Sequence, residues 1–157
     1  MRVDYSDQFA KQLDSTDANS IETYARSFFS SAPKWIIRLF KCRNTIVSFL
    51  GLKGSKIPKD RDEIIRNCQF NLNDKIGLFQ VMRKTKDEII LGQNDYHLDF
   101  RIIIGKKLVS EDLSLFISTE IQFHNFLGKV YFIVIKPFHR LIAQKMLHNM
   151  VKTAKCR

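Results

Sequence analysis

The chain has few cysteines and histidines, and their spacing excludes the common disulfide and metal-binding frameworks. Its three cysteines, Cys42, Cys68 and Cys156, lie far apart and include no C-x-x-C pair. We therefore expect reduced thiols rather than a disulfide scaffold or a zinc site. The four histidines show no H-x-x-x-H or H-E-x-x-H spacing, so we expect no metal ion and no cofactor.

Segments for export or membrane insertion are also missing. Asp4 and Asp7 stand where a signal peptide would need an apolar core. The longest apolar runs, such as Val130–Ile135, are far too short to span a bilayer. These absences predict a cytoplasmic protein without a transmembrane segment.

The motifs of several enzyme classes are absent as well. The six glycines form no G-x-G-x-x-G, and the chain contains no P-loop, no G-x-S-x-G and no Cys/His dyad. The sequence therefore favours a binding or interaction protein over an enzyme. A catalyst that works in a cavity without a motif stays open as an alternative.

What is present fits one folded domain over residues 1–157. A chain of 157 residues can bury a full hydrophobic core without metals or disulfides. Phenylalanine is unusually abundant, with 13 copies against one tryptophan. Many large rings must therefore fill the core or line a pocket.

The net charge of +10 is concentrated in two segments, residues 32–66 and residues 113–157, each of which carries +6. Both segments have helical patterns, and charge on a helix most often marks a solvated face. Binding to an acidic partner, a nucleic acid or a membrane is the less favoured alternative. No RNP, zinc-finger or helix-turn-helix pattern indicates nucleic-acid binding.

The first half of the chain predicts one strand followed by two helices. Apolar residues alternate over Val3–Leu13, which is typical of a strand. The polar cluster Asp14–Asp17 can cap a helix over Ala18–Ser30. A second helix is predicted from Pro33 to Leu50, and Lys56–Arg66 is expected to be a loop or a short helix.

The second half predicts antiparallel strands and then one long helix. The strands are expected at 79–85, 88–92, 96–104 and 113–123, with a turn at Lys86-Asp87 and a connection at 106–112. A helical pattern covers Leu127–Lys152, and Pro137 inside it predicts a kink near Ile133. This order of elements predicts an α+β fold in which a curved sheet wraps the last helix and leaves an apolar space between them.

Several sequence blocks resemble those of an uncharacterised bacterial family of unknown function. The segment Leu91–Arg101 resembles its "LG…D.HLDFR" block, and Thr119–Tyr131 and Pro137–Arg140 (PFHR) resemble two later blocks. The opening residues Asp4–Phe9 match the start of that family. The family is similar to the helix-grip superfamily (START-like, SRPBCC), which implies a helix-grip fold and a hydrophobic ligand held between the sheet and the last helix. In some bacterial proteins a similar domain follows a Rossmann NAD(P)-binding domain; the resemblance implies no catalytic residue.

Polar residues at three places are candidates for a functional role. Asp95, His97, Asp99 and Arg101 share one face of a predicted strand, where they could act in acid/base chemistry, bind an anion, or form ion pairs on a solvated surface. Thr119 interrupts an apolar row and could point a hydroxyl into the interior. His139 and Arg140 follow the proline and could meet a ligand's polar head, while Arg140 could instead pair with Asp99 or Glu120.

The residues expected to contact a ligand are aromatic or polar side chains on the predicted sheet and last helix. They are Phe79, Phe100, Thr119, Phe123, Tyr131, Phe138, His139 and Arg140. The aromatic members could equally fill a close-packed core.

The leading hypothesis is non-catalytic binding of a small hydrophobic molecule or lipid between the sheet and the last helix. The alternative is a module that docks on another protein, such as a nucleotide-binding oxidoreductase, through its basic helices. A third hypothesis is an enzyme that uses His97, Asp99 and Arg101 in a cleft.

Overall fold

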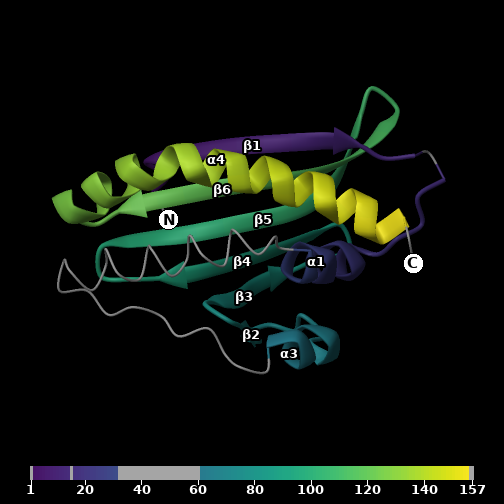
Figure 1. Cartoon of the computed structure of the whole chain (residues 1–157), viewed down its shortest axis with the longest axis horizontal. Helices are drawn as coiled ribbons and strands as arrows, with labels where there is room; N and C mark the ends of the chain where they lie inside the picture. Colours follow the sequence, from purple (N-terminus) through teal and green to yellow (C-terminus); the bar gives the residue numbers. More distant parts are fainter. Residues whose placement is uncertain (1, 15, 32–60, 156–157) are drawn as a thin grey trace.

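A six-stranded antiparallel sheet, in the order β1-β6-β5-β4-β3-β2, is the central element of the computed structural model (Figure 1). The structure describes residues 2–14, 16–31 and 61–155. The strands are β1 (Tyr5–Gln12), β2 (Lys75–Ile76), β3 (Phe79–Lys84), β4 (Glu88–Asn94), β5 (Leu98–Val109) and β6 (Asp112–Phe123). The helices are α1 (Ile21–Ser30), α3 (Arg61–Asn67) and α4 (Phe126–Lys155). The predicted α+β, helix-grip-like fold is confirmed, while the helix predicted from Pro33 to Leu50 lies outside the described residues.

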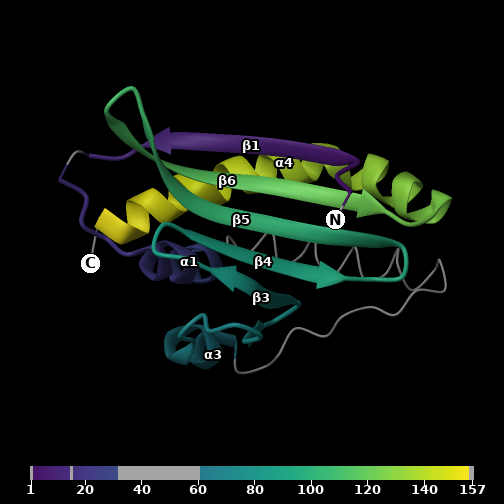
Figure 2. The ribbon, with the colours of Figure 1, turned by 180° about the vertical axis from the view of Figure 1, so that it is seen from behind.

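The helices α1 and α4 cover one face of the sheet. α4 packs on β1 and β6, whereas α1 packs on β4 and β5 and against α4. Figure 1 shows α1 at one end of the sheet beside the C-terminal part of α4. In Figure 2 the opposite face of the sheet is turned toward the viewer, and no described helix covers it. The two ends of the covered face therefore differ. Among the described helices, both α1 and α4 lie over one end of the sheet, and α4 alone lies over the other end.

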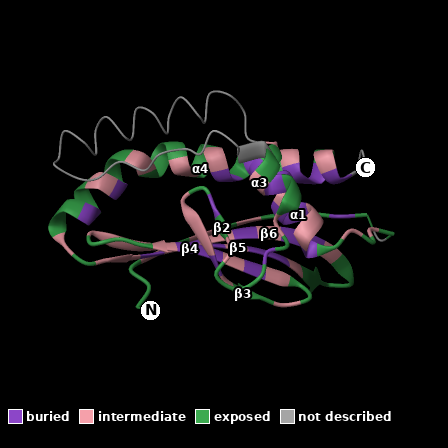
Figure 3. Cartoon of the chain, turned by 90° about the horizontal axis from the view of Figure 1, so that it is seen from below, coloured by how far each residue is buried: buried purple, intermediate pink, exposed green. Residues whose placement is uncertain are grey.

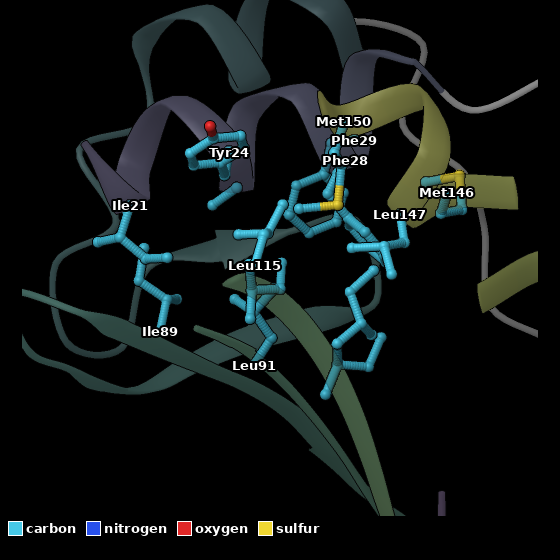
Figure 4. Close-up of a cluster of buried hydrophobic side chains, with 14 of the residues drawn as sticks. Ile21, Tyr24, Phe28, Phe29, Ile89, Leu91, Leu115, Met146, Leu147 and Met150 are labelled. Atoms are coloured by element: carbon cyan, nitrogen blue, oxygen red, sulfur yellow. The ribbon is translucent and has the colours of Figure 1, made fainter. Parts of the chain in front are cut away.

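The hydrophobic core lies where α1, the sheet and the second half of α4 meet. Figure 4 shows Tyr24 and Phe28 of α1 over Leu91 and Leu115 of the sheet, with Met150 of α4 beside them. These side chains are buried, and burial of each large apolar side chain contributes about 1.5–3 kcal/mol. Figure 3 shows the same contrast along α4, where buried residues are more frequent toward the C-terminus and exposed residues predominate toward the N-terminus.

The two longest strands extend further than the sequence pattern predicted. β5 and β6 pair continuously from Leu98↔Phe123 to Val109↔Asp112, so the predicted connection over 106–112 is wrong. The turn consists of Ser110 and Glu111, which have φ values of 49° and 74°. Left-handed turns of this kind normally contain Asn or Gly, and the absence of either residue removed the signal for a tight hairpin.

The start of β5 was predicted too early. Asp95, Tyr96 and His97 form the connection between β4 and β5, and Tyr96 is 82% exposed rather than part of the apolar row. The predicted β3–β4 hairpin is confirmed, and Lys86 and Asp87 lie at its turn.

The N-cap of α1 lies after the predicted capping cluster Asp14–Asp17. Ser20 is the N-cap, and its hydroxyl accepts a hydrogen bond from the backbone N–H of Thr23. Asp17 has a different role: it accepts a hydrogen bond from Tyr24 and forms an ion pair with Lys106 of β5 at 3.4 Å. The segment before α1 is thereby tied to the sheet.

The long helix α4 runs through Pro137 without interruption. Its axis changes direction in its N-terminal half, as Figures 1 and 3 both show. A proline inside a helix removes one backbone hydrogen bond and is a known cause of such a bend.

The start of α4 is fixed to the β4–β5 connection by polar contacts and close packing. Asn125 accepts a hydrogen bond at Oδ1 from the backbone N–H of Gly128 (3.0 Å) and donates one from Nδ2 to Nδ1 of His97 (2.9 Å). The backbone N–H of His124 donates to the carbonyl of His97. A Cβ atom at position 128 would overlap that same carbonyl oxygen. Glycine is therefore required here for the helix to approach the turn.

Gly128→Ala should destabilise the fold by about 1–3 kcal/mol, because backbone atoms rather than a flexible side chain would have to move. In an exposed helix the same change would stabilise by up to about 1 kcal/mol, so the sign of the effect is diagnostic. Urea unfolding measures it, with Lys129→Ala at the neighbouring exposed position as the control. A variant at least as stable as the wild type would contradict the close packing.

Candidate functional site

A small group of polar side chains is buried between the sheet and α4. Nε2 of His139 lies 3.0 Å from Oγ1 of Thr119 and 3.6 Å from Oδ1 of Asp7. The other carboxylate oxygen of Asp7 accepts a hydrogen bond from the hydroxyl of Tyr5 (2.8 Å). Thr119 is 1% exposed, and the side chains of His139 and Asp7 are 14% and 12% exposed. We call Asp7, Thr119 and His139 the buried polar cluster.

Three separate parts of the chain supply this cluster. Asp7 of β1 and Thr119 of β6 are directly opposite each other in the register of the sheet. Along β1, Asp7 is one of the partly buried residues that alternate with exposed ones. Along β6, Thr119 is one of the buried residues that alternate with partly buried ones. His139 reaches both because α4 packs on these two strands.

Aromatic rings surround the buried polar cluster. The ring of His139 lies 6.0 Å from that of Phe100 and 6.2 Å from that of Phe132. Phe132 also contacts Tyr5 and Phe123, at centroid distances of 4.6 Å and 5.7 Å. The polar groups thus lie in an apolar setting, where an unmatched hydrogen-bonding group is costly.

Burial and the Asp7 carboxylate determine the protonation of His139 and Tyr5. Burial lowers the pKa of His139, and the nearby Asp7 opposes this without reversing it. Burial also raises the pKa of Tyr5 to about 12, together with its hydrogen bond to Asp7 and the charge of that residue. At neutral pH the site therefore presents a neutral imidazole and a neutral phenol beside a carboxylate.

One acceptor in the cluster is left without a hydrogen bond. Among the described residues, no donor lies within hydrogen-bond reach of the buried Oδ1 of Asp7, since Nε2 of His139 is 3.6 Å away. Buried polar atoms are nearly always satisfied by protein, by ordered water or by a ligand. The Oδ1 atom is therefore a place where a hydroxyl or amine donor would be stabilised.

The geometry does not form a nucleophilic relay. In a Ser-His-Asp arrangement the carboxylate contacts one imidazole nitrogen and the hydroxyl contacts the other. Here Thr119 and Asp7 both lie near Nε2 of His139, so the carboxylate cannot orient the ring for proton removal from Thr119. Nor do the described residues include a group of three His, Cys, Asp or Glu side chains placed to bind a metal ion.

The structure brings together only part of the predicted ligand-contacting set. Thr119, His139, Phe100 and Phe123 belong to the cluster or to its aromatic surroundings, and Phe79 contacts Phe100 at 6.1 Å. Tyr131 is half-buried on α4.

Two predicted members are exposed. Phe138 is 47% exposed, and Arg140 is exposed but close enough to Tyr5 for its charge to oppose the rise in the pKa of that phenol. Helical spacing placed Phe138 in the apolar stripe, but α4 is apolar on two sides in this region, and Phe132 is the residue that faces the site.

The residues of the predicted polar strand face make separate local contacts. His97 contacts Asn125, and Asp99 pairs with His124 at 3.1 Å. Asp95 accepts a hydrogen bond from the backbone of Tyr96 in an exposed turn, and Arg101 donates one to the carbonyl of Phe100. Asp99 therefore has a partner other than Arg140, and each of the four residues has a local structural contact.

Sequence reasoning missed Asp7, Tyr5 and Phe132 as site residues. The signal for Asp7 was present: it interrupts the alternating row of Tyr5 and Phe9 in the same way that Thr119 interrupts its row. The register that sets the two interruptions side by side joins residues more than a hundred positions apart, and one sequence does not reveal it.

A hollow lies at the opposite edge of the sheet, beside α3. It has a volume of about 520 Å³ and is lined mostly by polar residues, together with Ile64 and Cys68. Cys68 is a free thiol, and burial raises its pKa, which makes it a poor nucleophile. Cys42 and Cys156 lie outside the described residues. This open hollow has none of the aromatic surroundings of the buried polar cluster.

The comparisons with known proteins place the chain among uncharacterised relatives. A family model described as "Protein of unknown function (DUF2867)" matches residues 1–146, which is nearly the whole chain. No curated protein and no solved structure matches it significantly.

The pH dependence of stability tests the burial of His139. A lowered folded-state pKa means that stability is fully present above the ordinary value of 6.5 and is lost as the pH falls from there toward the folded-state pKa. Urea unfolding between about pH 7.5 and about pH 5.5 should therefore show a falling free energy of unfolding, and this fall should be smaller in His139→Gln. His148→Gln, exposed on the same helix, is the matched control. Equal slopes for the wild type and His139→Gln would contradict the buried neutral imidazole.

Proposed function

Because the chain belongs to the DUF2867 family, whose description assigns no activity, we propose its function from the site: non-catalytic binding of a small hydrophobic molecule that carries a hydrogen-bond donor and no negative charge. The ligand lies between the sheet and the N-terminal half of α4. Its apolar body contacts Phe100, Phe123 and Phe132, and its polar head contacts the buried polar cluster.

The observation that carries this proposal is the unsatisfied Oδ1 atom of Asp7. Leaving a buried acceptor without a partner costs about 1–3 kcal/mol, and more for a charged group. A fold retains such a group at lower cost if a ligand or a bound water completes it. The aromatic rings around the cluster favour an organic ligand, since ligand sites are mostly apolar with a few placed polar groups.

The charges of the site indicate which head group fits. Asp7 presents a carboxylate, and the lowered pKa of His139 leaves the imidazole uncharged at neutral pH. Lys136 and Arg140 lie near Tyr5, but neither donates a hydrogen bond to Oδ1 of Asp7. A carboxylate or phosphate head could not donate a hydrogen bond to Oδ1 and would meet the negative charge of Asp7 there. A hydroxyl or amine donor would instead form a charge-assisted hydrogen bond to Oδ1. The ligand class that follows is a long-chain or polycyclic alcohol or amine rather than a fatty acid.

The layout of the fold supports the same site. A curved sheet packed against one long C-terminal helix is the arrangement in which START-like and SRPBCC proteins hold hydrophobic ligands, and we propose that the resemblance to them extends to ligand binding. An enzyme using His97, Asp99 and Arg101 is not favoured, because each of these residues makes a separate local contact. Docking on a nucleotide-binding oxidoreductase remains the alternative proposal.

Displacement of the fluorescent probe N-phenyl-1-naphthylamine tests the ligand class. We expect dodecanol to displace the probe at about tenfold lower concentration than dodecanoate, since one charge-assisted hydrogen bond is worth about 1.5–3 kcal/mol. In Asp7→Asn the amide can still accept from Tyr5 and would turn a donor toward the ligand. This variant should therefore lose the preference for dodecanol or reverse it.

Asp99→Asn is the matched control, because it makes the same chemical change in a residue that pairs with His124 instead. It should keep the wild-type preference. Native mass spectrometry of the freshly purified protein provides the independent arm, with a stoichiometric bound mass expected. Equal displacement by both compounds in the wild type, or an unchanged preference in Asp7→Asn, would overturn the proposal.

A further inference from the structure

The N-terminal half of α4 is apolar on the side that faces away from the sheet. Phe126 is 76% exposed and Ile133 is 69% exposed. The full set of large apolar side chains exposed on this half of the helix is Phe126, Leu127, Val130, Ile133, Val134, Phe138 and Leu141. We call these residues the outer face of α4.

Helical geometry shows that the outer face is continuous. Phe126, Val130, Ile133 and Leu141 follow one another at spacings of four, three and eight residues, which places them along one side of a helix. Gly128, Phe132 and His139 lie on the other side and face the sheet. A helix that is apolar on two sides is expected to have both sides covered, yet the residues of the outer face are exposed.

Basic side chains accompany the outer face. Lys129, Lys136 and Arg140 are exposed at spacings of seven and four residues, which forms a row beside the apolar one. The sequence of α4 contains no aspartate or glutamate. Lys136 lies over the ring of Tyr5 at 4.9 Å, so the basic row runs on the side of the helix toward β1.

We propose that the outer face of α4 binds the surface of a lipid bilayer that contains anionic lipids. An apolar stripe with aromatic residues and a basic border is the pattern of a helix that lies in the plane of a membrane interface. The apolar side chains enter the boundary of the acyl chains, while the basic row contacts negatively charged head groups. No described helix is long and apolar enough to cross a membrane, so the contact is with the surface.

Charge complementarity is what favours a bilayer over a protein partner. Anionic membranes attract polybasic segments by about 1 kcal/mol per basic residue near the surface, and α4 has basic residues with no acidic residue between them. This inference rests on the outer face alone and does not require a ligand at the buried polar cluster. If the ligand site and the membrane contact both exist, α4 contacts the ligand on one side and a bilayer, which can supply hydrophobic molecules, on the other.

Vesicle co-sedimentation of the full chain is the test. We expect binding to phosphatidylcholine vesicles that contain about 30% phosphatidylglycerol, at least about tenfold weaker binding to pure phosphatidylcholine, and weakening as salt rises. Ile133→Ser should weaken binding to the mixed vesicles about tenfold, since an exposed side chain can be replaced without loss of the fold. Lys136→Gln combined with Arg140→Gln should remove most of the salt dependence. The control is Leu108→Ser, which changes an apolar residue that is 74% exposed at the tip of β5, at the end of the sheet away from the N-terminal half of α4.

Three results would overturn the inference. The first is no binding to mixed vesicles at physiological salt. The second is Ile133→Ser binding as tightly as the wild type. The third is a concentration-dependent dimer, seen by analytical ultracentrifugation, that Ile133→Ser dissociates, because the outer face would then be an interface between two copies of the chain.

Discussion

The junction between the start of α4 and the β4–β5 connection is the constraint on which the rest of the site depends. The carbonyl of His97 meets Gly128 so closely that no side chain fits between them. His139 follows Gly128 by about three turns of helix, so the rotation fixed at Gly128 also directs His139 toward the sheet. The aromatic surroundings and the contact with Thr119 follow from that orientation. A helix rotated by a quarter turn would instead bury part of the outer face and expose the imidazole.

This arrangement brings together four blocks of the sequence that are distant in the chain: residues 4–9, 91–101, 119–131 and 137–140. The opening block supplies Asp7, and the PFHR block supplies its neighbour His139. The HLDFR block contributes His97 and Asp99, whose partners Asn125 and His124 come from the block that begins at Thr119. Blocks that are distant in the chain therefore meet at one end of the sheet, and they include both the helix junction and the buried polar cluster.

The sequence predicted much of the fold because hydrophobic periodicity reports which surface of an element is buried. Alternation identified β1, the β3–β4 hairpin and the β5–β6 pair, and helical spacing identified α1 and α4. Periodicity could not decide between two arrangements that produce the same apolar pattern. In α4 both sides are apolar, so spacing could not show that Phe132 faces the sheet while Phe138 does not. Thr119 was identified because it breaks an apolar row, but its pairing with Asp7 depends on strand register across the whole chain.

The position of β1 has a consequence for the proposed ligand, because it bears on how fast that ligand could leave the site. β1 is an edge strand: it pairs with β6, and no described strand pairs with its other edge. Edge strands belong to the parts of a fold that open locally at a free energy well below that of global unfolding. Brief separation of β1 from β6 would withdraw Asp7 and Tyr5 from the cluster while the core between α1 and α4 stayed intact. The residence time of the proposed ligand would then be set by the transient separation of β1 from β6 rather than by movement of α4.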